Sequence, residues 1–255
     1  MADSPWTLSG DDYEPARVAR ALSATSVAVV IPARDEAATI GPVLDAVTAF
    51  GDLDEVVVVD DHSRDDTAAV ARHHDARVVS LDGTRGKGAA MAAGARATTS
   101  ELVVFLDADV VNTTPHFVGR LLQPLLEDPR ILLVKGYYER PFHDMPTGGG
   151  RVNELAARPI LSLLFPGLGE IRQPLAGETA LRRDVLDALT LEDAYGVEIA
   201  LLIDVARRYG VHALAQVDLG VRRHRNRPLE ELRPMAVEVL RAALLRFGCE
   251  LPLER

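Results

Sequence analysis

The stretch from Ser26 to Asp61 decides the fold. It reads SVAVVIPARDEAATIGPVLDAVTAFGDLDEVVVVDD, with two short runs rich in valine and isoleucine on either side of an alanine-containing segment. The valine runs do not alternate with polar residues, which is typical of parallel strands that helices cover on both faces. The stretch therefore predicts a strand, a helix and a second, parallel strand.

The same pattern continues outward from this unit. After it come DDTAAVARHH, ARVVS, GAAMAAGARAT and ELVVFLD, which extend the order to β-α-β-α-β-α-β. This order predicts an α/β fold with an open, doubly wound, mostly parallel sheet flanked by helices. In such sheets ligands bind beyond the carboxyl ends of the strands.

The remaining segments are less regular. We divide the chain into an N-terminal arm at 1–25, an α/β region at 26–138 and a second region of the same domain at 139–255. Because termini are often loosely packed, we expect residues 1 to about 20 to be poorly ordered or loosely packed. In the second half we expect helices at 115–126, 151–164, 198–209 and 228–247, strands at 131–138 and 212–219, and a loop at 141–150.

Composition excludes several classes of protein. The 255 residues are 47% hydrophobic and carry a formal net charge of −10, which argues against a nucleic-acid partner. No apolar run approaches the roughly 18 residues of a membrane span, and the N-terminus lacks the features of a signal peptide. We therefore expect a cytoplasmic protein without a membrane partner. The single cysteine, Cys249, cannot form an internal disulfide.

Asp107 and Asp109 stand where an apolar run ends, in FLDADVV. On an extended segment residues i and i+2 point to the same side, so both carboxylates can face one ligand. A hard divalent cation such as Mg²⁺ or Mn²⁺ relieves their repulsion and binds a diphosphate. Two solvated turn aspartates are the alternative, and for so short a motif the two are about equally favoured.

Other strand ends carry further polar groups. The segment TRGKGAAMAAG opens a helix at Lys87, where an anion is favoured, although its spacing fits neither a P-loop nor a dinucleotide motif. Taken alone the motif is a weak signal, and a helix-starting turn with a surface lysine is the favoured, simpler explanation. Asp60 and Asp61 end the second strand and can accept hydrogen bonds from a base or a ribose.

A basic cluster stands out in this acidic chain. The segment VRRHRNRP contains four arginines, which bind phosphate well, and His224, which can ligate a metal. GGGR ends at Arg151, and its backbone amides can approach an anion closely. With these groups we expect a second anion site, to which further basic residues contribute: Lys135, Arg140 and Arg158. Glu198, before an amphipathic helix, is either a ligand or a first-turn glutamate that favours the helix dipole.

Taken together, these residues resemble a known family. The blocks VVIPARDEAATI, VVVVDDHSRDDT, GKGAAMAAG, FLDAD, GGGRVNELAARPIL, QPLAGE, YGVEIALLID and AQVDLGVRRHRNRPLEEL resemble those of the glucosyl-3-phosphoglycerate synthases of actinobacteria. The resemblance implies a GT-A fold, a homodimer and a divalent cation, Mg²⁺ or Mn²⁺. It also implies transfer of glucose from UDP-glucose to the 2-hydroxyl of D-3-phosphoglycerate with retention of configuration.

The resemblance also implies roles for individual residues. Asp109 and His224 hold the metal. Asp107 and Glu198 are the candidate catalytic residues, and both lie near the donor or the acceptor. The remaining residues bind the nucleotide-sugar (Pro32, Ala33, Glu36, Asp61, Lys87, Asp107 and Tyr195) or the acceptor (Gly150, Arg151, Asn153 and Asn226).

Three positions depart from the family pattern and leave alternatives open. The family commonly has Ser at Asp61, Ser at Ala108 and Thr at Asn153. The first departure leaves the donor base open, and the third leaves the acceptor open. The alternatives are mannosyl transfer from GDP-mannose to a phosphoglycerate or glycerate, transfer to a polyprenyl phosphate, and a non-catalytic nucleotide-sugar-binding regulator. No amphipathic membrane-seeking segment supports the polyprenyl acceptor.

Overall fold

A computed structural model describes residues 4–51, 53–83, 85–142, 145–148, 150–223 and 229–251. Its centre is a sheet of eight strands in the order β1-β10-β6-β9-β5-β2-β3-β4. Neighbouring strands are parallel except around β9, which is antiparallel to both β5 and β6. The strands are β1 (Trp6–Leu8), β2 (Val27–Ala33), β3 (Glu55–Asp60), β4 (Arg77–Ser80), β5 (Leu102–Phe105), β6 (Leu133–Glu139), β9 (Thr179–Arg182) and β10 (Leu214–Val221).

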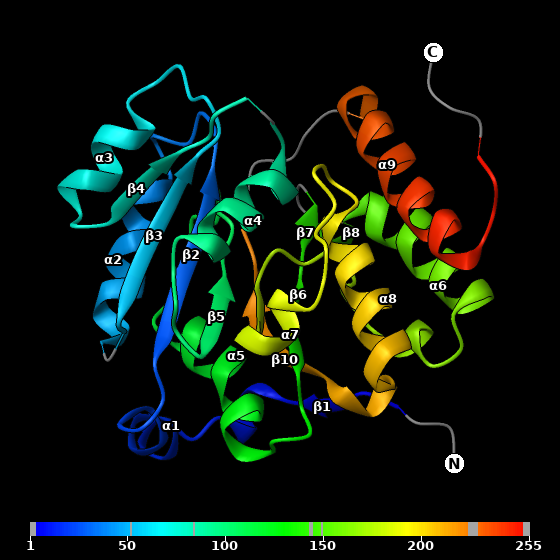
Figure 1. Ribbon diagram of the computed structural model, residues 1–255, viewed down its shortest axis with the longest axis horizontal. Helices are drawn as coiled ribbons and strands as arrows, with labels where there is room; N and C mark the ends of the chain where they lie inside the picture. The colour runs from blue at the N-terminus through cyan, green and yellow to red at the C-terminus, as the bar shows by residue number, and fades with distance from the viewer. Residues whose placement is uncertain are drawn as a thin grey trace.

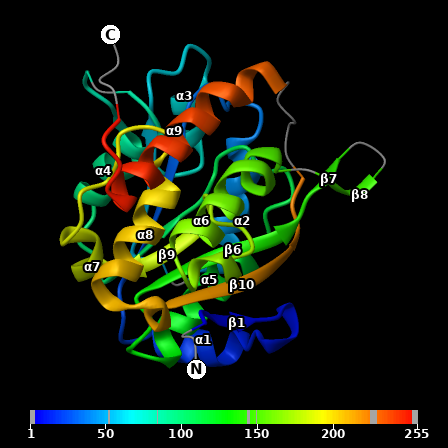
Figure 2. The ribbon, with the colours of Figure 1, turned by 90° about the vertical axis from the view of Figure 1, so that its right-hand side faces the viewer.

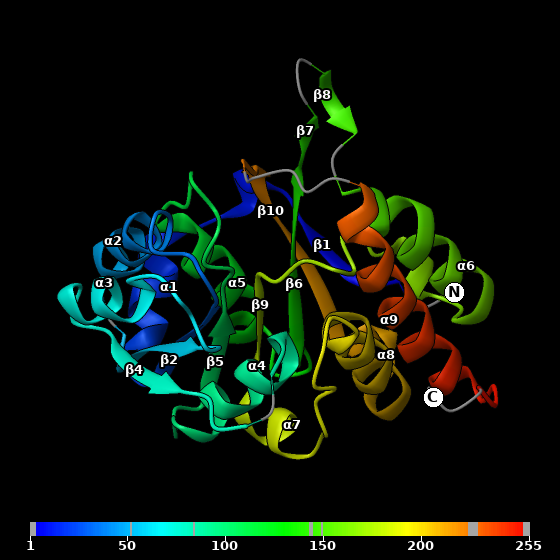
Figure 3. The ribbon, with the colours of Figure 1, turned by 90° about the horizontal axis from the view of Figure 1, so that it is seen from above.

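Helices cover both faces of this sheet, as the sequence predicts. Successive residues of β2 face opposite sides: Val29 and Ile31 pack in one apolar cluster, and Val30 packs in the other. The first cluster includes residues of α1 (Pro15–Leu22), α2 (Ile40–Phe50), α3 (Thr67–His73) and α5 (His116–Glu127). The second includes residues of α4 (Lys87–Arg96), α6 (Arg158–Leu164), α7 (Arg183–Asp187), α8 (Val197–Tyr209) and α9 (Leu229–Phe247). In Figures 1 and 3, α6, α8 and α9 lie together at the end of the molecule away from α2 and α3.

The open, mostly parallel α/β fold is therefore confirmed. The strands and helices predicted at 26–138 are present, with ends that differ by a few residues. The antiparallel strand β9 was not predicted, because its four residues, TALR, do not form the apolar run of valine, isoleucine or leucine seen in the predicted strands. The division of the chain at residues 25 and 138 stays a prediction, although β9 and β10 complete the sheet that β2 to β6 begin.

The prediction of a loosely packed N-terminal arm is wrong for the described residues. Strand β1 pairs in parallel with β10, with Trp6 opposite Ala215, and Leu8 is buried. Helix α1 follows after the short turn η1 (Gly10–Asp12) and buries Val18 and Leu22. The segment packs because the free edge of β10 offers backbone groups that a further strand can pair.

The segment predicted as a loop at 141–150 contains a small hairpin. Strands β7 (Pro141–Phe142) and β8 (Met145–Gly148) pair in an antiparallel manner and project from the body of the molecule (Figure 2). The proline and glycine content predicted a loop and did not predict this strand pairing. The chain then returns through a π-helical turn, η2 (Asn153–Ala157), into α6. Short 3-10 turns precede β9 and β10, η3 (Leu168–Glu170) and η4 (Val211–Ala213).

Candidate active site

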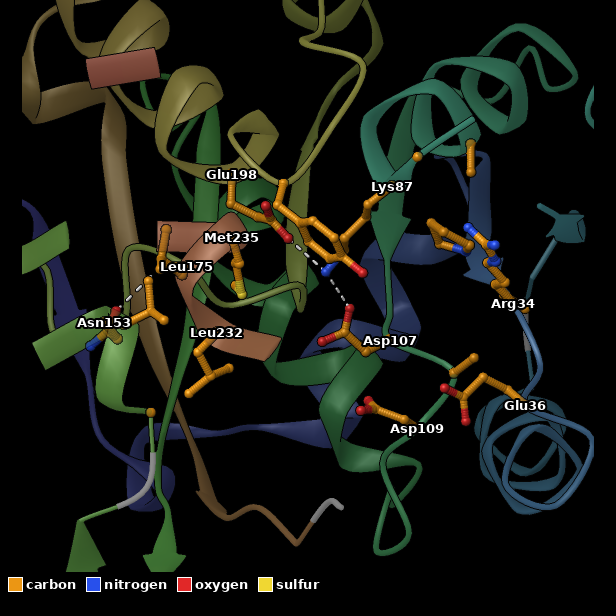
Figure 4. A pocket seen from close by; sticks show the side chains of 18 of the residues that line it. Arg34, Glu36, Lys87, Asp107, Asp109, Asn153, Leu175, Glu198, Leu232 and Met235 are labelled. Atoms are coloured by element: carbon orange, nitrogen blue, oxygen red, sulfur yellow. Dashed lines mark hydrogen bonds and ion pairs between the residues drawn. The ribbon is translucent and has the colours of Figure 1, made fainter. Parts of the chain in front are cut away.

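A cavity of about 280 Å³ lies at the carboxyl ends of β2, β3 and β5 and is closed by residues of α4, α8 and α9 (Figure 4). The residues to which the family resemblance assigns a role, where the structure describes them, line this cavity: Pro32, Ala33, Glu36, Asp61, Lys87, Asp107, Asp109, Gly150, Arg151, Asn153, Tyr195 and Glu198. His224 and Asn226 lie outside the described residues. The structure thus brings together residues from distant parts of the chain, while their individual roles stay predictions.

Lys87 connects the carboxylate pair to the opposite wall of the cavity. It is the first residue of α4, and its Nζ lies 2.6 Å from Asp107 Oδ1 and 2.6 Å from Glu198 Oε1, in the first turn of α8 (Figure 4). Burial opposes the charge on Lys87, but the two carboxylates outweigh it and raise its pKa above the ordinary value. Lys87 is therefore a fixed cation in the cavity and not the surface lysine of the simpler interpretation.

Arg222 is the main residue of the site that the sequence analysis did not identify. It follows β10, its side chain is 2% exposed, and Nη2 donates to Asp107 Oδ2 at 2.7 Å and to Asp109 Oδ1 at 3.0 Å. Its Nη1 donates to Glu178 Oε2 at 3.2 Å and to the Tyr138 hydroxyl at 2.7 Å. The arginine-rich segment indicated cations here, but local sequence could not show that the first of them turns inward to three carboxylates.

The two aspartates differ in what they can still bind. Both oxygens of Asp107 are engaged, Oδ1 by Lys87 and Oδ2 by Arg222. Burial raises the pKa of Asp107, but the two cations lower it far more, and the result lies well below the usual range. A Cβ on Gly177 would collide with the Asp107 carboxylate, so only glycine fits there. Asp107 is thus a locked anion.

Asp109 fits a divalent cation better. Its side chain is 31% exposed, it lines the cavity, and Arg222 contacts only Oδ1. Carboxylate oxygens are the ligands that Mg²⁺ and Mn²⁺ prefer. No cluster of three metal-ligating side chains exists among the described residues. Asp109 therefore suits the metal as one ligand of a set that phosphate oxygens, and a further residue such as His224, would complete.

The glycines beside Lys87 are explained by packing. A Cβ on Gly88 would collide with the carbonyl oxygen of Glu192, so the loop before α8 lies directly against the start of α4. Asp61, which is buried, accepts a hydrogen bond at Oδ2 from the Gly86 amide at 3.1 Å. These contacts fix the start of α4 and with it the position of Lys87. Asp60, which we also expected to meet the ligand, does not line the cavity.

Gly150, Arg151 and Asn153, beside Arg140, form the end of the cavity that we expect to bind the acceptor, called the acceptor end below; the end with Asp61, Lys87 and Asp107 is called the donor end. Asn153 is buried, and its Nδ2 donates to the Arg172 carbonyl oxygen at 3.2 Å and to Glu154 Oε1 at 3.0 Å. Both amide protons are therefore used inside the protein. Binding of the acceptor by Asn153 stays a prediction, and any such contact competes with these two hydrogen bonds.

Two of the basic residues assigned to the second anion site lie elsewhere. Lys135 is 1% exposed in β6, and its Nζ donates to the Ala176 carbonyl oxygen and to Thr179 Oγ1 at 2.9 Å. Burial lowers its pKa to about 8. Arg158 pairs with Glu154 on the surface, at 2.7 Å. The expectation was wrong for these two, because Lys135 is buried in a central strand and Arg158 lies on an outer helix turn, and neither lines the cavity.

The cavity joins a carboxylate pair that follows a strand, a lysine held between two carboxylates and a cationic end, at the carboxyl edge of a mostly parallel sheet. The family model for glycosyl transferase family 2 matches residues 28–188. The glucosyl-3-phosphoglycerate synthase of Mycobacterium tuberculosis (strain ATCC 25618 / H37Rv) is 44% identical over 259 residues, which cover 95% of this chain and 78% of that protein. The chain therefore belongs to glycosyl transferase family 2 and, within it, to the glucosyl-3-phosphoglycerate synthases.

Solved structures agree with this assignment. The crystal structure of the M. tuberculosis enzyme with Mn²⁺, UDP-glucose and phosphoglyceric acid is 43% identical, with a TM-score of 0.89, and covers 98% of this chain and 88% of that one. The structure with Mg²⁺ and UDP is 42% identical, with a TM-score of 0.89, and covers 96% and 88%. Within the described residues, no helix is long and apolar enough to cross a membrane.

Proposed function

We propose that the protein transfers glucose from UDP-glucose to the 2-hydroxyl of D-3-phosphoglycerate, with retention of anomeric configuration. The observation that carries the proposal is the set formed by Lys87, Asp107 and Glu198 beside Asp109, in one cavity with a cationic end. A related enzyme that is 43% identical binds Mn²⁺, UDP-glucose and phosphoglyceric acid together, which supports both the donor and the acceptor.

Asp109 would hold a divalent cation, Mg²⁺ or Mn²⁺, together with His224, which lies outside the described residues. When bound, the cation stabilises the negative charge that develops on the departing diphosphate. Asp107 stays an anion because Lys87 and Arg222 hold both of its oxygens. It therefore keeps Lys87 in place beside the donor.

We infer that Glu198 binds the sugar and does not attack it. Its Oε1 is held by Lys87, and its Oε2 is buried without a hydrogen-bond partner in the described part of the chain. A buried carboxylate oxygen without a donor is costly unless a ligand supplies one, and a sugar hydroxyl can do so. We therefore propose front-face transfer: the acceptor 2-hydroxyl forms the new bond to C1 as the bond from C1 to UDP breaks, and its proton passes to the released diphosphate.

The test crosses donors with acceptors. UDP-glucose and GDP-mannose are each incubated with 3-phosphoglycerate and with glycerate, with Mg²⁺ or with EDTA, and the products are weighed by mass spectrometry. We expect a hexosyl product only from UDP-glucose with 3-phosphoglycerate and Mg²⁺. A product from GDP-mannose would replace the donor, and binding of UDP-glucose without turnover on any of these acids would support a regulator instead.

The catalytic role of Glu198 is tested separately. If Glu198 binds the sugar, Glu198→Gln lowers turnover and no covalent adduct forms with a slow donor analogue. A glucosyl adduct on Glu198, detected by mass spectrometry of its peptide, would show a nucleophile instead. Unchanged turnover in Glu198→Gln would remove the residue from the mechanism.

We also propose a cytoplasmic homodimer. Large apolar side chains are exposed on the second region, with Leu155 at 77%, Leu163 at 80% and Phe247 at 49%. They lie on η2, α6 and α9, which contact one another. Light scattering after size exclusion measures the mass directly. A monomer at micromolar concentration would refute this part of the proposal.

A further inference from the structure

Tyr138 is a buried tyrosine near the end of β6 that none of the assigned roles uses. Its hydroxyl oxygen accepts hydrogen bonds from Arg140 Nη2 at 2.8 Å and from Arg222 Nη1 at 2.7 Å. Its ring also contacts both guanidinium groups, whose central carbons lie 4.9 Å and 5.2 Å from the ring centroid. One side chain therefore holds two cations through its oxygen and its ring.

The two arginines depend on Tyr138 to different degrees. Arg222 is also held by Asp107, Asp109 and Glu178. For Arg140, the Tyr138 hydroxyl is the only hydrogen-bond partner of the side chain in the part of the chain that the structure describes. Loss of the hydroxyl should leave Arg222 in place and release Arg140.

Arg140 has unused donors at the acceptor end of the cavity. It lines the cavity, and its Nε is buried without a partner among the described residues. Its guanidinium lies against Gly150, where a Cβ would come within 3.5 Å of Nη1. Gly150 has a φ of 72°, a conformation that favours glycine, so the backbone turns next to the guanidinium. A guanidinium with free donors beside a turn of backbone is suited to a phosphate or a carboxylate.

Resting on the proposed function, we propose that Arg140 is a further binding residue for the anionic acceptor and that Tyr138 is its positioning residue. Because the same hydroxyl holds Arg222, Tyr138 also joins the acceptor end of the cavity to the carboxylate pair at the donor end. Acceptor and donor are thereby set at a fixed spacing by one buried side chain.

Tyr138→Phe tests the inference because it removes only the hydroxyl and keeps the ring. Tyr137→Phe is the matched control: Tyr137 is the neighbouring buried tyrosine of β6, its hydroxyl donates to the Leu8 carbonyl oxygen at 3.2 Å, and it does not line the cavity. For Tyr138→Phe we expect the KM for 3-phosphoglycerate to rise about tenfold, the worth of one hydrogen bond to a charged group. The KM for UDP-glucose should change less than about twofold, and Tyr137→Phe should change neither.

Arg140→Met and the double variant Tyr138→Phe with Arg140→Met complete the cycle. Arg140→Met should raise the acceptor KM at least as much, and adding Tyr138→Phe to it should have little further effect, because both act through one guanidinium. Equal kinetics of Tyr138→Phe and Tyr137→Phe would overturn the inference. A fall in kcat with an unchanged acceptor KM would overturn it as well.

Calorimetric titration of the UDP-bound enzyme with inorganic phosphate separates this inference from the proposed function. If the wild-type protein binds phosphate but transfers no glucose to 3-phosphoglycerate, the proposed function fails. Weaker phosphate binding in Tyr138→Phe than in Tyr137→Phe would then still support the anion site. If transfer occurs and phosphate binds equally to both variants, the inference alone fails.

Discussion

The two ends of the cavity are built in different ways. At the donor end, Asp61 follows β3 directly and Asp107 follows β5 after one residue. Both strands pair in parallel with β2, and Lys87 opens α4. At the acceptor end, Tyr138, Arg140 and Arg222 come together only because β10 pairs with β6. Donor-end side chains are therefore placed by local sequence at strand ends, whereas acceptor-end side chains are placed by long-range pairing. We expect donor-end substitutions to affect catalysis alone. Substitutions in the buried network of Arg222 and the carboxylates that it contacts should affect stability as well.

The largest effect should come from Asp109→Ala. Loss of the partly exposed carboxylate removes a metal ligand, and because the charge stabilisation of a divalent cation is worth several kcal/mol, we expect transfer to fall about a thousandfold. Asp107→Asn should lower it less, since an amide can still bond Arg222 or Lys87. Steady-state rates at saturating Mg²⁺ measure both.

Asp60→Asn is the control for this prediction. Asp60 ends β3 but does not line the cavity, and its Oδ1 accepts from the Ser63 amide at 3.2 Å. The transfer rate of Asp60→Asn should stay within about twofold of the wild-type rate, because substitutions away from a site have small effects. If Asp107→Asn transfers glucose more slowly than Asp109→Ala, the prediction that Asp109 matters more than Asp107 is refuted.

Arg222→Met tests the buried network. It leaves three carboxylates without their shared guanidinium, and breaking such a buried pair should lower the free energy of unfolding by about 3 kcal/mol. Arg222→Lys should recover part of the loss, because it keeps the charge but not the fork of donors. Urea unfolding measures the difference.

The adjacent Arg223 gives the matched comparison. Its side chain is exposed, and its backbone amide donates to Asn112 Oδ1 at 2.8 Å, a bond that substitution of the side chain preserves. Arg223→Met should therefore change stability by less than about 0.5 kcal/mol. Equal destabilisation by the two substitutions would show that Arg222 and its three carboxylates do not stabilise the fold as a unit.

Lys135 should make the stability of the folded protein depend on pH. Burial lowers its pKa from 10.5 to about 8, so between these values the unfolded chain binds a proton that the folded chain does not. The folded state therefore gains stability from this group as pH rises from 8 toward 10.5, and below pH 8 the penalty is constant.

From pH 7.5 to 9.5 we expect the free energy of unfolding of the wild type to rise by about 2 kcal/mol relative to Lys135→Met. Denaturant titrations at both pH values measure it. Arg130→Met, which removes an exposed arginine that keeps its charge across this range, should show no such trend relative to the wild type. A difference that does not change with pH would mean that Lys135 is not a buried cation near pH 7.5.

The sequence could predict the donor end better than the acceptor end, because the donor end depends on local sequence. The runs of valine predicted β2, β3 and β5 because their apolar pattern is local, and with them the edge on which Asp61, Lys87 and Asp107 meet. The antiparallel β9 could not be predicted in this way, because its residues, TALR, lack the run of valine, isoleucine or leucine that marks β2, β3 and β5. Its placement between β5 and β6 brings Gly177 against Asp107 and Glu178 against Arg222.

Arg222 and Lys135 show the limit for single residues. Both are basic, and both were read as groups that could meet an anionic ligand. Whether a basic side chain meets a ligand or a carboxylate of its own protein depends on which strand lies beside it. Arg222 is turned inward by Glu178 and the two aspartates, and Lys135 by the carbonyl oxygen of Ala176, contacts that span at least 41 residues of sequence.

The smallest expected effect concerns the N-terminal segment, which the sequence predicted to be loose. Gln123 of α5 is buried and ties this segment down: its Oε1 accepts from the Glu14 amide at 2.8 Å, and its Nε2 donates to the Asp12 carbonyl oxygen at 2.8 Å. Gln123→Ala should lower the free energy of unfolding by about 1–2 kcal/mol, because two backbone groups lose their partner, while the rate of transfer stays unchanged. Thr48→Ala, an exposed position on α2, is the control and should change stability by less than about 0.5 kcal/mol. If Gln123→Ala is as stable as Thr48→Ala, the segment before α1 contributes little to the stability of the fold, as the sequence-based expectation of a loosely packed arm had it.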